Sequence, residues 1–145
     1  MRNLILFAFL ALLMTSCADK SGSNKKQADE EKVILPDVVT FNEHIAPIIF
    51  ENCTPCHRPH SAGPFPFTTY DEIKAKAKTI SKVTQSRFMP PWPADPTYTN
   101  FKGERILTVT EIAMIKKWVE DDCPVGDVAK IPAVPHYPEG SQIGT

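Results

Sequence analysis

The stretch ENCTPCHRPH, residues 51–60, places two cysteines and a histidine within five positions, at Cys53, Cys56 and His57. Two thiols separated by two residues can form a redox-active disulfide, supply half of a zinc site, or attach a haem covalently. The helical pattern around this stretch and the signals at the N-terminus favour one of the three, and that choice also predicts the fold.

The N-terminal residues have the pattern of an export signal. Residues 4–14, LILFAFLALLM, are wholly apolar and follow a single positive charge at Arg2. Such a run is too short for a comfortable permanent membrane span and fits the core of a secretory signal. It ends in MTSC, which resembles the lipobox of bacterial lipoproteins. Residues 1–17 are therefore predicted to be a signal peptide with Cys17 as the lipid-bearing residue, and plain secretion with a free Cys17 is the alternative.

The rest of the 145 residues divide into a tether, one domain and a tail. Residues 18–35 hold four acidic and four basic side chains, and the region 18–36 is predicted to be a flexible tether. Residues 37–128 form the expected domain, and residues 129–145, which lack periodicity, form an extended tail. Loss of Arg2 with the signal moves the formal net charge from −1 to −2. This charge argues against nucleic acid as a partner.

Three segments share one helix-start signal, with Thr three residues before Glu, in TFNE (40–43), TYDE (69–72) and TVTE (108–111). This spacing predicts a capping box, in which the Thr side chain and the Glu side chain each bond the other's backbone N–H. Apolar side chains at helical spacing follow each signal. They are Phe41, Ile45, Ile48 and Ile49; then Ile73, Ala77, Ile80 and Thr84; then Ile112, Ile115 and Val119, with Trp118 at the edge. Pro47 is expected to kink the first helix.

No segment shows sustained strand alternation, so the sequence predicts an all-α fold with three main helices. Seven of the fourteen prolines fall in the two connections between them, CHRPHSAGPFPFT and MPPWPADPTYTNFKGERIL. The second connection is about twenty residues long, which is more than loops in compact domains usually have without a functional reason. Something other than regular secondary structure is expected to organise these long Pro-rich loops.

The helical context decides between the three readings of the cysteine pair. A redox Cys-x-x-Cys usually opens a helix beside a parallel sheet, whereas this pair follows a helical stripe. A structural zinc site needs four ligands, and the remaining Cys123 stands alone, although His44, His60 and His136 could contribute. The adjacent His57 completes Cys-x-x-Cys-His, in which the two thiols bond the haem and the imidazole ligates its iron. The sequence therefore predicts one covalent haem c, in a compartment where such haem is attached.

The sixth iron ligand decides what a bound haem does, because a filled position favours electron transfer and an open one binds oxygen, peroxide or gases. The candidates are Met14, Met89, Met114, His44, His60 and His136. Met89 is favoured because it directly follows the second helix and precedes Pro90, which disfavours helical geometry at Met89. His136, in the tail, is the main rival.

Residues around the two ligands are candidates for supporting roles. A carbonyl within AGP, residues 62–64, is expected to accept the proton of His57 Nδ1 and orient the ring, which makes Pro64 a candidate cofactor contact. Trp92, beside Met89, is a candidate partner of the haem propionates, as are Tyr98 and Arg105.

The stretches VTFNEHIAPIIFENCTPCHRPHSAGPF, RFMPPWPADP and LTVTEIAMIKKWVEDDCPVGD resemble a monohaem cytochrome c domain of exported bacterial proteins. Domains of this kind often precede copper-dependent monooxygenase-like or peroxiredoxin-like domains. The resemblance spans residues 38 to about 128 and implies a small cytochrome c-like fold around one haem, with His57 and Met89 as iron ligands. Cys123 and His60 stand where small residue types are usual.

These observations predict a lipid-anchored, monomeric electron-transfer protein rather than an enzyme, with redox proteins as partners. The lysines after the second helix start are a candidate docking face for an acidic partner, or a plain solvated helix face. Two alternatives stay open. One is a haem peroxidase or gas sensor with an open or labile sixth position, and the other is an electron-delivery module for a separate monooxygenase or oxidase.

Overall fold

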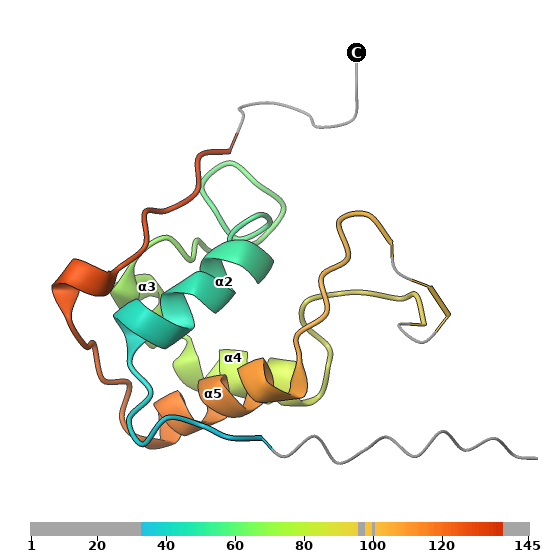
Figure 1. The fold of residues 1–145 in the computed structure, drawn as a ribbon. Helices are drawn as coiled ribbons and strands as arrows, with labels where there is room; N and C mark the ends of the chain where they lie inside the picture. Colours follow the sequence, from blue (N-terminus) through green and yellow to red (C-terminus); the bar gives the residue numbers. More distant parts are fainter. Residues whose placement is uncertain (1–32, 96–97, 100, 138–145) are drawn as a thin grey trace, which may run out of the picture. The chain divides into compact units, whose positions relative to one another are not determined.

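The computed structural model describes residues 33–95, 98–99 and 101–137 (Figure 1). The predicted signal peptide, Cys17, most of the tether and the end of the tail lie outside the described residues. The described part contains helices and no strand, so the all-α prediction is confirmed. None of the helices within these ranges combines the length and the apolar character needed to cross a membrane.

The first predicted helix is present as two consecutive pieces, the π-helical turn η1 (Phe41–Ile45) and the α-helix α2 (Ala46–Asn52). Pro47 lies in the first turn of α2, where its missing N–H removes no α-helical hydrogen bond. The change from π to α geometry falls directly before Pro47, the residue at which a kink was expected. Phe41, Ile45, Ile48 and Ile49 are all buried, as their spacing predicted.

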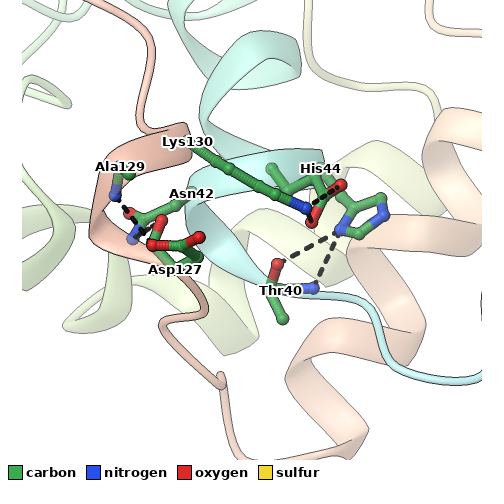
Figure 2. Close-up of polar contacts among 7 residues, drawn as sticks. Thr40, Asn42, His44, Asp127, Ala129 and Lys130 are labelled. Atoms are coloured by element: carbon green, nitrogen blue, oxygen red, sulfur yellow. Dashed lines mark hydrogen bonds and ion pairs between the residues drawn. The ribbon is translucent and has the colours of Figure 1, made fainter.

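The capping box predicted at Thr40 is wrong. The backbone N–H of Thr40 donates a hydrogen bond to His44 Nδ1 at 3.1 Å (Figure 2). In the predicted box, the side chain of Glu43 would have been the acceptor. Glu43 instead pairs with Lys130, at 2.9 Å. The π turn brings residue 44 rather than residue 43 over the helix start, which explains the exchange. The other two boxes, Thr69 with Glu72 and Thr108 with Glu111, are confirmed.

The second predicted helix is divided into α3 (Tyr70–Lys74) and α4 (Ala77–Gln85), with a break at residues 75–76. The predicted stripe nevertheless faces the core, since Ile73, Ala77, Ile80 and Thr84 are buried. The third helix, α5 (Val109–Glu120), packs against α4 and η1. Trp118 does not lie at the edge of its stripe as expected. It is fully buried, packs 6.0 Å from the ring of Phe41, and donates from Nε1 to the Pro124 carbonyl.

The segment after α5 is held against the first helix. The short 3-10 helix η2 (Val128–Lys130) begins at Asp127, whose side chain accepts from the Ala129 N–H. Asn42, buried in η1, donates from Nδ2 to the Asp127 carbonyl at 3.0 Å (Figure 2). Residues 131–137 have no regular secondary structure, and Tyr137 contacts the end of α2. The described part of the predicted tail is mostly exposed and contacts the domain through Lys130 and Tyr137.

Candidate functional site

The motif of residues 53–57 begins where α2 ends. Cys53 is the C-cap residue of α2, and its carbonyl accepts from the N–H groups of Cys56, at 3.1 Å, and His57, at 2.9 Å. These bonds fold residues 53–57 into one compact turn that carries both thiols and the imidazole. All three side chains are half-buried. The helix end thus supplies a fixed starting point for the three groups that the sequence analysis singled out.

The His57 ring is oriented by a backbone carbonyl. Nδ1 lies 3.1 Å from the carbonyl oxygen of Phe65. Because a carbonyl only accepts hydrogen bonds, Nδ1 carries the proton, and the lone pair of Nε2 is left for another partner. The carbonyl was expected within residues 62–64, so that expectation is wrong by one residue. Pro64 itself is exposed, and its carbonyl is not the acceptor.

Three further contacts hold the loop around His57. The ring packs 4.6 Å from Phe67 and 5.3 Å from Phe65, centroid to centroid. Gly63 passes so close that a Cβ there would lie 2.6 Å from His57 Nδ1. Thr54, fully buried, donates from Oγ1 to the Phe67 carbonyl at 2.8 Å. The sequence analysis did not identify these contacts. The one sequence feature that indicated a close approach here is the glycine within AGP.

The electrostatics of Cys53 disfavour disulfide exchange. Burial, together with the negative charge of a Cys56 thiolate, raises the pKa of the Cys53 thiol to about 12. Redox-active cysteines have lowered pKa values, often at a helix N-terminus, whereas Cys53 stands at a helix C-terminus, where the dipole disfavours a thiolate. In addition, the described side chains include no group of three or more His, Cys, Asp or Glu placed to hold a metal ion. A four-ligand zinc site therefore lacks support in this part of the chain.

Met89 and Trp92 line one small pocket of about 110 Å³. Met89 follows α4, and its N–H donates to the Val83 carbonyl at 3.1 Å. Arg87 ties the same loop to the start of α5 by donating to the Leu107 carbonyl at 3.1 Å. The Nε1 of Trp92 is buried without a hydrogen-bond partner in the described structure. Buried N–H groups rarely lack a partner, so this donor points to a missing acceptor.

Arg105 connects the pocket to the motif. It lines the same pocket as Met89 and Trp92, and its Nη1 lies 3.5 Å from Cys56 Sγ. The long loop between α4 and α5 is therefore in contact with the turn that follows α2, although about fifty residues separate them. The side chains that could hold a cofactor here are Cys53, Cys56, His57, Met89, Trp92 and Arg105.

The other candidates lie elsewhere. His60 and His136 are exposed, and His44 accepts from Thr40 as described above. Met114 packs against the core on α5. Cys123 is buried, and desolvation raises the pKa of its thiol. Of the sixth-ligand candidates, Met89 lines the pocket whose Arg105 contacts Cys56.

Comparison with known proteins adds no relative: the chain matches no protein-family model, and the searches of curated proteins and of solved structures find no match.

Proposed function

We propose that this chain is a monohaem c-type cytochrome that transfers single electrons at the periplasmic surface of a bacterial membrane. The sequence resemblance to haem domains of exported bacterial proteins supports this function. The proposed fold is the small cytochrome c type, of which the helical part is established above. The redox partners are other proteins, and lipid at Cys17 supplies the membrane anchor.

The observation that carries the proposal is the bond from His57 Nδ1 to the Phe65 carbonyl, at 3.1 Å. It fixes the tautomer that an iron ligand needs, with Nε2 unprotonated, and it holds the ring in one orientation. The Cys53 and Cys56 thiols lie in the same turn, at the spacing that forms two thioether bonds with haem vinyl groups. A histidine that only filled space in the core would need neither the neighbouring thiols nor this tautomer.

The buried Trp92 Nε1 is an independent test of whether the residues fit a haem. This donor lacks a partner in the described structure, and Trp92 lines the same pocket as Arg105, which contacts Cys56. A haem carries two propionates, which are strong acceptors, so Trp92 and Arg105 would hold that edge of the group. These two donors are of the kind that a propionate edge would need, which supports the proposed cofactor.

When bound, a haem supplies an iron that alternates between the ferric and ferrous states. His57 and Met89 would ligate the iron, and the thioether of Met89 would favour the ferrous state and raise the potential. The Met89 loop is fixed by the bonds from Arg87 to Leu107 and from Met89 to Val83, which keeps this ligand in place. A filled sixth position supports electron transfer over peroxidase or sensor activity.

The test is expression of the chain in a bacterium that attaches c haem, followed by optical spectra of the purified protein. A chromophore that stays on the denatured chain establishes the covalent haem, and a chain without it refutes the proposal. Met89→Ala should lose the ferric Fe–S absorption band, whereas Met114→Ala, a matched change on α5, should keep it. Prompt binding of carbon monoxide by the wild-type ferrous protein would favour the sensor or peroxidase alternative.

The anchor is tested separately. Wild type should partition with membranes and Cys17→Ser should not, while both carry the same haem. Partition of both variants with the soluble fraction would leave electron transfer in place but would refute the lipid anchor.

A further inference from the structure

The last turn of α2 leaves one carbonyl without its usual backbone partner. In an α-helix the N–H of Thr54 would donate to Phe50, four residues before it. Here the Thr54 N–H donates to the Ile49 carbonyl at 2.9 Å, and the Cys53 N–H donates to the same oxygen at 2.8 Å. The Phe50 carbonyl is therefore one of the orphan acceptors that a helix end must satisfy by other means.

Tyr137 supplies the missing donor. Its hydroxyl donates to the Phe50 carbonyl at 2.8 Å across 87 residues of sequence. The segment from η2 to Tyr137 runs past α2 to the loop that follows it (Figure 1). Desolvation raises the pKa of Tyr137, although the nearby Arg58 and Arg105 charges oppose the shift. The phenol is therefore protonated and able to donate at neutral pH.

Tyr137 also contacts the loop that carries His57. The guanidinium of Arg58, the residue after His57, lies 4.6 Å from the centroid of the Tyr137 ring. Arg58 Nη1 donates in turn to the Pro55 carbonyl, between the two cysteines. The Tyr137 side chain thus bonds the helix turn immediately before Cys53 with its hydroxyl, and it packs against the residue immediately after His57 with its ring.

We propose that Tyr137 is a positioning residue for the haem-binding segment 53–57, which it clamps from both ends. The inference rests on the proposed function and extends it, because it assigns a role to the segment that follows the predicted cytochrome domain. Loss of the hydroxyl removes one net hydrogen bond, worth about 1 kcal/mol, so opening of the segment should become about fivefold more frequent. A looser segment admits water beside the iron ligand, and water favours the more highly charged ferric state.

The experiment compares haem-loaded Tyr137→Phe with haem-loaded Tyr70→Phe. Tyr70 is a matched control, because its hydroxyl also donates to a backbone carbonyl at 2.8 Å, that of Cys123 in the segment after α5. Both variants lose one equivalent bond, so both should lose similar stability in denaturant unfolding. Only Tyr137→Phe should lower the reduction potential and speed hydrogen exchange of the Cys53 and Thr54 amides about fivefold.

Equal potentials and equal amide exchange in the two variants would overturn the inference while leaving the proposed function in place. Absence of haem from the wild-type protein would refute both together. If Tyr137→Phe yields no folded protein, Arg58→Lys takes its place, because lysine keeps the charge and loses the planar contact with the ring. Arg58→Lys should lower the potential in the same direction, and an unchanged potential would count against the clamp.

Discussion

Replacement of Gly63 by alanine should displace His57 with little effect on the rest of the fold. A Cβ at this position would lie 2.6 Å from His57 Nδ1 and 2.8 Å from both His57 Cγ and the Cys56 carbonyl oxygen. Ordinary contacts are about 3.5–4.0 Å, so the overlap is about 1 Å on two sides at once. The turn cannot simply open, because the Gly63 N–H itself donates to the Cys56 carbonyl at 2.8 Å.

The cost has two parts. Insertion of one carbon into a filled space costs about 1–3 kcal/mol, and loss of the bond from His57 Nδ1 to Phe65 adds about 1 kcal/mol. We therefore expect Gly63→Ala to lose about 2–4 kcal/mol of unfolding free energy in the haem-loaded protein, measured by denaturant titration. Because small domains are stable by about 5–15 kcal/mol, the variant should still fold. Its optical spectrum and reduction potential should change, since the displaced ring is the proposed iron ligand.

Gly103→Ala is the control. Gly103 has φ +77° and open space where a Cβ would stand, so its substitution adds backbone strain of about 1 kcal/mol and no collision. It should leave the spectrum unchanged. If Gly63→Ala matched Gly103→Ala in both stability and spectrum, the inference that close packing against Gly63 orients His57 would be wrong.

Three further changes test other contacts. Thr54→Val should cost about 1–3 kcal/mol in denaturant unfolding, because the Phe67 carbonyl loses its buried donor, whereas the exposed Thr79→Val should cost little. Desolvation raises the pKa of Glu72, but hydrogen bonds from Thr68 and Thr69 outweigh it and hold this pKa below its ordinary value of 4.5. The stability that the ionised Glu72 contributes is therefore present above pH 4.5 and is lost as the pH falls through the lowered pKa. In thermal unfolding, Glu72→Gln should lack this part of the acid destabilisation. His44 Nδ1 accepts from the Thr40 N–H at the start of the first helix, so His44→Ala should lose about 1 kcal/mol of unfolding free energy in a denaturant titration. His44→Asn, whose side-chain oxygen replaces Nδ1 as acceptor, should keep most of that stability, and an equal loss in the two variants would contradict the assigned cap.

The helical pattern was predictable because it depends on local signals. Two capping boxes and the buried faces of α2 and α4 follow from residues within one or two turns of each other. The exceptions depend on distant partners. Glu43 pairs with Lys130 and does not form the expected capping box. Trp118 is buried where it packs against the Phe41 ring and donates to the Pro124 carbonyl. Apolar spacing within α5 alone does not contain that information.

The candidate site likewise combines residues that local sequence signals identify with contacts that only the folded chain shows. The sequence named the cysteines, His57 and Met89 by residue type and spacing, and the structure places them in a turn and a pocket that Arg105 joins. It did not identify the Phe65 carbonyl or Tyr137. Any residue type can offer a carbonyl, so only the path of the loop decides which one reaches Nδ1. Tyr137 stands in a stretch without periodicity, and its partner is 87 residues away.

Both groups proposed to ligate iron lie just beyond the ends of helices, not within them. Cys53 to His57 follow α2, and Met89 follows α4, so regular helix geometry fixes where each segment starts but not where its side chains point. Long-range bonds fix that direction: Thr54 to Phe67, Arg87 to Leu107 and Tyr137 to Phe50. Loss of one such bond removes only about 1 kcal/mol, which a folded domain tolerates, yet a ligand displaced by a fraction of an ångström alters the iron. Variants at these contacts should therefore change the reduction potential at denaturant concentrations where the helices are still intact. If the potential changed only together with helix content, the loop contacts would not control the site independently of the helices.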